Sequence, residues 1–510
     1  MTNDRIPGPG PGLWALVLVA ATVAAAPAVA DPWALSGDPV LRHDLRLLAD
    51  AGVVRAPVNA WPIPWASLAA DLDSDTRFDA DPRLASDPAV LAARARVATR
   101  LNEVRGLVGL QPNARLAARS EEFWLRGFED TPREENEVRA GVSWMGNRVA
   151  ARAQLSRTAD PLPGDNKWRG DGSYIAGVLG NHIIYGGALD RWWGPGYQDS
   201  LVLSSNARPV SGFGVQRSVA RPFANDLLSR LGPWSYSFVW GFLESDRELP
   251  DARLMAFRLD FRPTTRLELG LSRAALWCGR GESCGGSAAL DVVTASGEGA
   301  DQLTALDFRW QPPLAPGRWA VYGQGVAQDR DLGFSSRWFG QLGLETWGSI
   351  ETRPLSGSWR AHLEYSNTTI QPWRSEPRYG LAYNTPPHAS GHRHRARALG
   401  AAFDGDGELL TAGVGLVDEG ARSWNLAVRY GTLNKRGDGS GDDLLHTVAP
   451  EETRIFGAQL THRRDISAGS LRLGTVSAGL GLQYADNRVT GGSDTDPQVF
   501  LQWTWDYSRL

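Results

Sequence analysis

The spacing of hydrophobic positions divides the chain into a helical part and a β part. Between about residues 38 and 110, apolar side chains recur every three or four positions, which is the period of an amphipathic helix. From about residue 115 to the end they recur every second position, the period of a strand with two different faces. The pattern therefore predicts a small helical region followed by a large β region.

The helical region contains start signals for separate short helices. Asp38-Pro39 and Asp87-Pro88 each place an N-cap aspartate before a proline suited to the first helical position. A further short helix is expected over residues 65–72, after the prolines at 62 and 64. Helices this short cannot enclose a core alone, so we expect the bundle to pack against the β region.

The β region predicts 18 to 20 strands, many of which reach the 9 to 11 residues needed to cross a bilayer at a tilt. The last strand has one face of Leu501, Trp503, Trp505 and Tyr507 and an opposite face that is polar. An apolar outer face and a polar lumen are typical of barrels in a membrane, because lipid surrounds them. We therefore predict a mainly β fold, a large antiparallel transmembrane β-barrel of about 18 strands with a small N-terminal periplasmic α-helical bundle.

The lengths of the connections leave one inconsistency in this prediction. Long connections are expected at residues 159–172, 279–300, 368–394, 433–452 and 486–498, and such barrels carry their long loops outside the cell. Counting strands back from a periplasmic C-terminus, with residues 396–403 as a strand, puts 433–452 outside but 368–394 inside. One missed strand, over residues 379–383, or a loop folded into the lumen would remove the conflict.

The N-terminus indicates export. An apolar stretch of about 14 residues follows Arg5, and Ala28-Val29-Ala30 matches the small-residue cleavage pattern of a signal peptide. No later stretch approaches the ~20 apolar residues of a membrane-spanning helix. The predicted division is residues 1–30 as signal peptide, 31–113 as periplasmic helical bundle and 114–510 as outer-membrane barrel.

Composition narrows the possible partners. The formal net charge of -4 and the pI near 6.1 give no basis for binding nucleic acid. The two cysteines, Cys278 and Cys284, lie close together on a glycine-rich loop, so in an oxidising compartment they can close a disulfide; the alternative is two unpaired thiols. The 21 tryptophans suit aromatic girdles at a membrane interface, a sugar-binding surface, or both.

Residues 190–209 form the first candidate binding site. Trp192 and Trp193 can stack on sugar rings, while Arg191, Asn206 and Arg208 supply hydrogen-bond donors for hydroxyl or carboxylate groups. The alternative is that the same tryptophans pack a corner of the barrel. The residues leave both interpretations open.

A second candidate is the basic run that contains His392, Arg393 and Arg395. Alternating arginines that enter a barrel can form a ladder for acidic sugar residues; the alternative is a rim of exposed charge. A metal site is not expected, because two neighbouring histidines without a nearby cysteine or acid make a poor ligand set. We predict no metal and no cofactor.

Several motifs, taken in order, resemble the Wzi-type capsule assembly proteins. Besides residues 190–209, they are Leu41-Arg42-His43-Asp44, Trp61-Pro62-Ile63-Pro64-Trp65, Leu231-Gly232-Pro233-Trp234 and Glu364-Tyr365-Ser366-Asn367-Thr368. The resemblance implies an outer-membrane lectin, in contact with outer-membrane lipid, that binds capsular or extracellular polysaccharide and helps attach or assemble it at the cell surface without catalysis. We expect a monomer.

Two other functions remain open at this point. A porin-like sugar channel would conduct ions across a planar bilayer, which a lumen plugged by the helical bundle should prevent. An outer-membrane polysaccharide-degrading enzyme would need a pair of carboxylates about 5 to 10 Å apart, which a sequence cannot reveal. Polysaccharide binding without turnover would separate the lectin from both.

Overall fold

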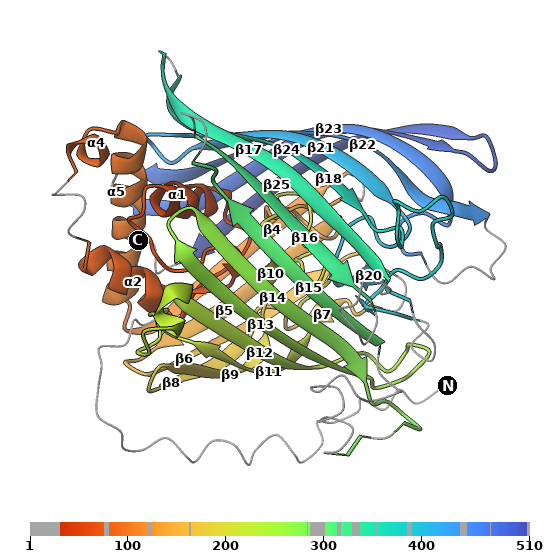
Figure 1. Ribbon diagram of the computed structural model, residues 1–510, viewed down its shortest axis with the longest axis horizontal. Helices are drawn as coiled ribbons and strands as arrows, with labels where there is room; N and C mark the ends of the chain where they lie inside the picture. Colours follow the sequence, from red (N-terminus) through yellow and green to blue (C-terminus); the bar gives the residue numbers. More distant parts are fainter. Residues whose placement is uncertain are drawn as a thin grey trace.

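The computed structural model describes most of the chain after the predicted signal peptide (Figure 1). The described residues are 31–75, 81–120, 125–162, 165–282, 284–285, 301–313, 318–328, 337–352, 355–384, 390–438, 446–469 and 471–506. The signal peptide predicted over residues 1–30 lies outside them. The helices are α1 (Pro39–Asp50), α2 (Trp65–Asp73), α4 (Pro82–Ala85) and α5 (Pro88–Gly106).

Eighteen antiparallel strands of the described chain close into one barrel, as predicted. The last strand pairs with the first, β25 with β4, and this pair completes the ring. The two-residue β7 and the longer β8 both pair with β6 and share one place in the ring. The strands are β4 (Gly109–Arg119), β5 (Asn136–Met145), β6 (Val149–Thr158), β7 (Trp168–Arg169), β8 (Tyr174–Leu179), β9 (His182–Ala188), β11 (Ser211–Arg217), β12 (Trp234–Phe242), β13 (Arg253–Thr264), β14 (Leu267–Trp277), β15 (Asp301–Trp310), β16 (Trp319–Ala327), β17 (Trp338–Thr352), β18 (Leu355–Asn367), β21 (Glu408–Asp418), β22 (Ser423–Asp438), β23 (Glu451–Ala468), β24 (Leu471–Asn487) and β25 (Ser493–Asp506).

Short strand pairs lie outside the ring. They are β1 (Trp33–Ala34) with β3 (Ile63–Pro64), β2 (Ala60–Trp61) with β10 (Trp192–Trp193), and β19 (Arg393–His394) with β20 (Arg397–Ala398). The second of these joins the N-terminal region to the tryptophan pair of the predicted site. A 3-10 turn, η1, covers Leu228–Leu231.

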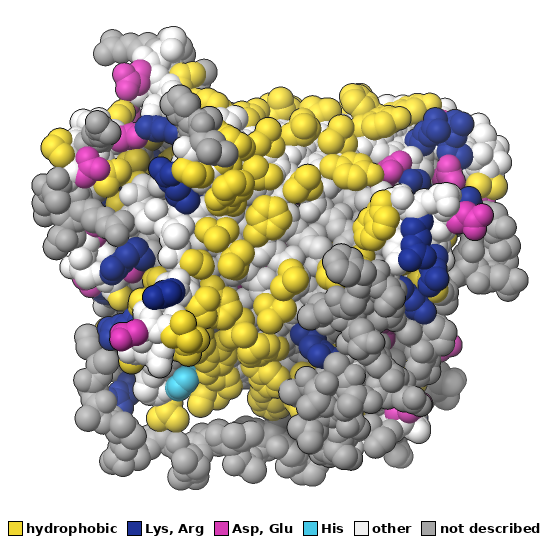
Figure 2. All heavy atoms as spheres, viewed as in Figure 1, with side chains coloured by type: hydrophobic (Ala, Val, Ile, Leu, Met, Phe, Trp, Pro, Cys, Tyr) yellow, Lys and Arg dark blue, Asp and Glu magenta, His cyan; other side chains and the backbone are white. Residues whose placement is uncertain are grey.

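Alternation along the strands separates an apolar outside from a polar inside. On β25, Leu501 is 58% exposed whereas Gln502 is 6% exposed, as predicted for these two positions. Residues 503–506 are all partly exposed, and Tyr507 of the predicted apolar face lies outside the described residues. On β13, Arg258 and Asp260 are buried in the lumen, where they pair with each other. Figure 2 shows the outward side chains as a broad apolar surface on the face of the barrel wall that is in view. Because such a surface is stable only in lipid, this is a transmembrane barrel.

The helices begin where their caps predict. The Asp38 side chain accepts a hydrogen bond from the Leu41 amide at 3.0 Å, and Asp87 accepts from the Ala89 and Val90 amides. Both caps satisfy amide groups that the first helical turn leaves unpaired. No helix of the described part is both long and apolar enough to cross a membrane.

The two ends of the barrel differ. The helices gather at one end (Figure 1), together with short turns such as residues 146–148, 180–181 and 419–422. We call it the helix end. The connections 189–210, 243–252 and 368–407 leave the strands at the opposite end, which we call the long-loop end.

One predicted strand is wrong, and its removal settles the counting problem. Residues 396–403 do not belong to the barrel; they contain only the two-residue β20, and β18 pairs directly with β21. With that strand removed, connections 368–407 and 439–450 leave from the same end of the barrel. Residues 397–407 are buried without alternation, because the loop that contains them folds inward instead of lying in the wall.

Candidate functional site

The tryptophan pair of the predicted site lies inside the protein. Trp192 and Trp193 form β10 and are each 1% exposed. The Trp192 ring meets the Phe128 ring edge-on at 5.5 Å, and Trp193 belongs to a core cluster with Leu201. Both indoles are covered by other parts of the chain, an arrangement that favours the packing interpretation over stacking on sugar.

The polar residues of the same segment are occupied by the protein's own groups. Arg191 donates to the Leu189 carbonyl and the Tyr185 hydroxyl, and the Asn206 amide donates to the Ala398 carbonyl at 3.0 Å. Arg208 forms ion pairs with Asp165 and Asp171. These contacts hold the inward fold of the segment and tie it to its neighbours.

The second predicted cluster lies on loop 368–407 and is only partly accessible. Arg393 is buried and pairs with Asp404 at 2.6 Å, and the fully buried His392 lies 3.5 Å from Asp301. Arg395 remains partly exposed, 3.4 Å from Asp246. Of this cluster, Arg395 is therefore the residue best placed to meet an external ligand.

The structure brings the two predicted sites together. The Ser204 amide donates to the Leu399 carbonyl at 2.7 Å, and the Tyr383 hydroxyl donates to the Leu201 carbonyl at 2.7 Å. A buried apolar cluster that includes Val202 and Phe403 joins loops 189–210 and 368–407 inside the barrel. The two loops thus fill the part of the lumen that lies beyond α1.

Loop 368–407 also carries exposed groups that the sequence analysis did not single out. Trp373 is 67% exposed, in a hairpin closed by the bridge between Ile370 and Arg378. Nearby in sequence, the Tyr379 ring lies 4.8 Å beneath the Arg436 guanidinium. The sequence contains a sign of this exposure, because Trp373 lies among proline, arginine, serine and glutamate, outside any alternating pattern. An exposed indole beside cationic groups is suited to stacking on a sugar.

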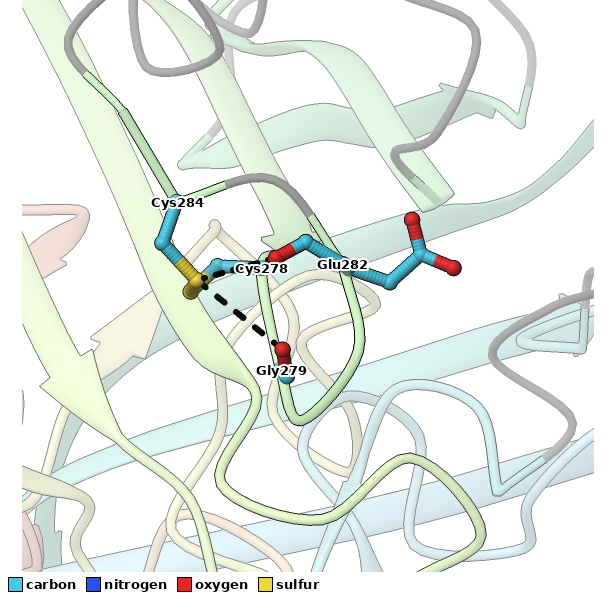
Figure 3. Close-up of a disulfide and its surroundings, with 4 residues drawn as sticks. All are labelled: Cys278, Gly279, Glu282 and Cys284. Carbon is cyan, nitrogen blue, oxygen red and sulfur yellow. Dashed lines mark hydrogen bonds between the residues drawn. A yellow bond between two sulfur atoms is a disulfide. The ribbon is translucent and has the colours of Figure 1, made fainter.

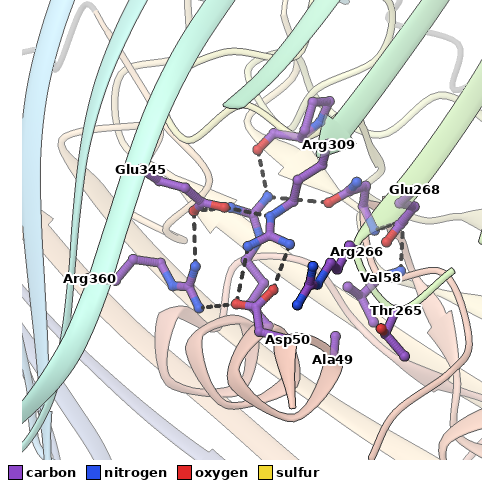
Figure 4. Close-up of polar contacts among 12 residues, drawn as sticks. Ala49, Asp50, Val58, Thr265, Arg266, Glu268, Arg309, Glu345 and Arg360 are labelled. Atoms are coloured by element: carbon purple, nitrogen blue, oxygen red, sulfur yellow. Dashed lines mark hydrogen bonds and ion pairs between the residues drawn. The ribbon is translucent and has the colours of Figure 1, made fainter. Parts of the chain in front are cut away.

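An ion network inside the lumen fixes α1 to the wall (Figure 4). Asp50 on α1 accepts from Arg309 on β15 at 2.7 and 3.1 Å, and from Arg360 on β18 at 2.9 Å. Glu345 on β17 binds the same two arginines and also Arg46 of α1, the last at 3.3 Å. Because each charge has partners of opposite sign, the network can remain buried.

A second carboxylate pair links loop 189–210 to the wall. Glu364 on β18 accepts from the amides of Tyr197, Gln198 and Asp199. Asp199 is fully buried, and it accepts one hydrogen bond, from the Ala402 amide at 2.9 Å. Burial, and then the neighbouring Glu364, raise the pKa of Asp199 to about 8. Asp199 is therefore protonated at neutral pH.

Cys278 and Cys284 form a disulfide at the end of β14, with their Cα atoms 4.9 Å apart (Figure 3). The bridge closes a short turn at the long-loop end, where the Cys284 sulfur also approaches the Gly279 and Glu282 carbonyls. Among the residues that the structure describes, no group of three or more histidine, cysteine or acidic side chains could hold a metal ion.

Comparison with known proteins identifies the family. Residues 111–489 match the family model described as capsule assembly protein Wzi. A Klebsiella pneumoniae protein described as an uncharacterized 55.8 kDa protein in the cps region is 25% identical over 452 residues, which cover 85% of this chain and 83% of that protein. The solved structure of Escherichia coli Wzi, described as a carbohydrate-binding β-barrel outer-membrane protein involved in group 1 capsule assembly, matches with a TM-score of 0.77 at 23% identity and covers 93% of this chain and 99% of that chain. The motifs, the barrel and the family match agree, and the chain belongs to the Wzi capsule assembly family.

Proposed function

We propose that this protein is an outer-membrane lectin that binds capsular or extracellular polysaccharide at its long-loop end and helps to attach it to the cell surface. The observation that carries the proposal is the arrangement of this end. Loops 189–210 and 368–407 close the lumen, and loop 368–407 presents Trp373 and Arg395 outward. Membership of the capsule assembly family and the carbohydrate binding described for the Escherichia coli protein support it.

The proposal assigns different roles to the residues of the two predicted sites. Arg395, with Trp373, contacts the polysaccharide. Arg191, Trp192, Trp193, Asn206, Arg208, His392 and Arg393 hold the loops in the shape that presents those contacts. This division follows their burial and their internal hydrogen bonds.

The proposed orientation in the membrane follows from the lengths of the connections. Barrels of this class have short periplasmic turns and long external loops, so the helix end, with the bundle predicted over residues 31–113, faces the periplasm. The membrane barrel predicted over residues 114–510 begins slightly earlier, at Gly109 of β4. Lipid covers the apolar wall seen in Figure 2. The closed ring leaves no strand edge for pairing with another chain, which supports the proposal of a monomer. In this proposal the protein binds the polymer without cleaving it.

The test is polysaccharide binding by the purified full-length protein in detergent. Immobilised acidic and neutral capsular polysaccharides are compared with dextran, and release of reducing ends is followed at the same time. We expect saturable binding without release, and at least a tenfold weaker affinity for Trp373→Ala, a loss equivalent to about 1.4 kcal/mol.

Trp144→Ala is the matched control, because Trp144 is a 44% exposed indole on β5 next to a helix-end turn. This variant should bind like the wild type. Absence of binding by the wild-type protein to every polysaccharide contradicts the proposed function, and full binding by Trp373→Ala removes that residue from the site.

A further inference from the structure

A cavity of about 130 Å³ lies between α1 and the barrel wall. Its wall side is formed by β18, β21, β22 and β23, and the remaining sides by α1 and the segments around Phe128 and Tyr197. It lies at the level of α1, away from the loop surface that carries Trp373. The cavity is thus separate from the proposed polysaccharide site.

The charges around this cavity do not balance. Four arginines line it, of which Arg46 and Arg360 share Glu345 at 3.3 and 3.1 Å. The other two, Arg42 and Arg429, form no ion pair with a carboxylate of the described chain. Arg42 donates from one nitrogen to the carbonyls of residues 195 and 196, and Arg429 donates to two glutamine side chains.

The carboxyl groups that act on these two arginines lie outside the cavity lining. They are Glu364 for Arg42 and Asp199 for Arg429, and Glu364 is occupied by the amides of residues 197 to 199. Glu129 is the one carboxyl group among the described residues that line the cavity, and it accepts a 2.7 Å hydrogen bond from the Thr461 hydroxyl. Burial raises the pKa of Glu129, so its negative charge is disfavoured. Burial, and then Arg46, lower the pKa of Arg42 to about 9, so Arg42 keeps its charge at neutral pH.

Side chains that line the cavity also carry donors without acceptors. Arg42 is 4% exposed, and its Nε and Nη1 atoms have no hydrogen-bond partner. The buried hydroxyl of Thr411, on the facing wall, also has none. The guanidinium carbon of Arg42 lies over two aromatic rings, 4.1 Å from the Phe128 centroid and 4.7 Å from that of Tyr197, and these contacts restrict its position.

Buried donors and uncompensated cations together specify the chemistry of a ligand. A guanidinium presents paired N–H donors that match the two oxygens of a carboxylate or phosphate. A buried charge is tolerated when it is paired and hydrogen-bonded. A volume of about 130 Å³ limits the occupant to a small ion or a single small carboxylate.

We propose that this cavity binds a small oxyanion, a carboxylate or a phosphate group, between Arg42 and Arg429. The ligand would bridge α1 to the strand pair β22–β23 and so fasten the plug to a part of the wall that the Asp50 network does not reach. The proposal concerns a site additional to polysaccharide binding and does not depend on it.

The test is titration of the full-length protein in detergent, in a phosphate-free buffer containing sodium chloride. Inorganic phosphate, acetate and neutral acetamide are added separately, and binding heat and the thermal unfolding midpoint are measured. We expect saturable binding of phosphate, acetate or both, with a raised midpoint, and no effect of acetamide. Binding of one anion alone identifies the source of the oxyanion. Absence of saturable binding by both anions overturns the proposal.

The variants Arg42→Gln and Arg429→Gln should each weaken anion binding at least tenfold. Arg105→Gln is the matched control, because Arg105 is a partly exposed arginine of α5 that pairs with Asp73 outside the cavity. Without added anion, Arg429→Gln should unfold at the same temperature as the wild type or higher, because the substitution removes an uncompensated charge. An unfolding temperature that is not lowered shows that weaker anion binding comes from loss of the ligand contact and not from loss of folding. Unchanged affinity in both cavity variants also overturns the proposal.

Discussion

At the scale of single residues, burial favours one of the two interpretations of the tryptophan pair, packing, over the other, stacking on sugar. Adjacent tryptophans beside arginine, glycine and proline suit a sugar platform and a packed corner equally well, because both uses exploit the large apolar face of indole. The sequence cannot distinguish them, since the difference is made by Phe128, which reaches Trp192 from another segment, and by the core cluster that encloses Trp193. Trp373 has the opposite environment, and only the folded loop reveals that it is exposed.

Asp199 gives a prediction for the dependence of stability on pH. Its pKa is about 8 in the folded protein and near 3.8 in the unfolded chain, so unfolding releases a proton between these values. The stability that Asp199 contributes is fully present below about pH 4 and is lost as pH rises to about 8, by roughly 1.4 kcal/mol per pH unit at most. Asn at this position does not titrate.

The measurement is the thermal unfolding midpoint of the wild type and of Asp199→Asn at pH 5 and pH 8.5. We expect the variant to gain relative to the wild type as pH rises. Asp246→Asn, a half-exposed carboxylate at the same end of the barrel, is the control and should show a constant difference. An equal difference at both pH values for Asp199→Asn would show that this carboxyl group titrates normally.

At the scale of elements, much of the structure follows from local rules. Asp38 and Asp87 place two helix starts, and alternation places the barrel strands, because lipid and lumen impose opposite demands on successive residues. Residues 396–403 mislead because Ala398, Leu399 and Phe403 are apolar for a different reason, burial inside a folded loop. Residues 396–403 do not alternate regularly between apolar and polar side chains, and this distinguishes them from the barrel strands in the sequence.

The joining of α1 to the wall, by contrast, depends on residues far apart in the chain. Asp50→Asn should destabilise the protein by about 3 to 5 kcal/mol, because Arg309 and Arg360 would lose a buried partner. Denaturant unfolding in detergent measures this. Asp73→Asn, whose side chain is 59% exposed and pairs with Arg105, should cost at most about 1 kcal/mol. Equal losses for the two variants would show that the network does not anchor the helix.

At the scale of the whole molecule, the lumen is occupied from both ends. A barrel of 16 to 18 strands is wide enough for an aqueous channel when it is left open. Here α1 and its neighbours fill the helix end, and loops 189–210 and 368–407 fill the remainder. A channel function would require these parts to move out of the barrel.

This arrangement predicts the electrical behaviour of the protein. The wild type inserted into a planar bilayer should carry no steady ion current, whereas a general porin of similar strand number in the same bilayer should conduct. Single-channel recording over a range of voltages measures this. A stable open level in the wild type would return the porin-like function to consideration.

The strands differ in length around the ring, so the rim of the barrel at the long-loop end is higher on one side than on the other. β22, β23 and β24 have 16, 18 and 17 residues, while β8, β9 and β11, across the ring, have 6, 7 and 7. At about 3.3 Å per residue, the longest strand measures roughly 59 Å and rises well beyond a ~30 Å hydrocarbon layer even when tilted. The rim is therefore a slope with a tall side and a low side (Figure 1). We therefore expect a bound polymer to approach sideways, over the low side, and to lie against the tall side, more nearly parallel to the membrane than perpendicular to it.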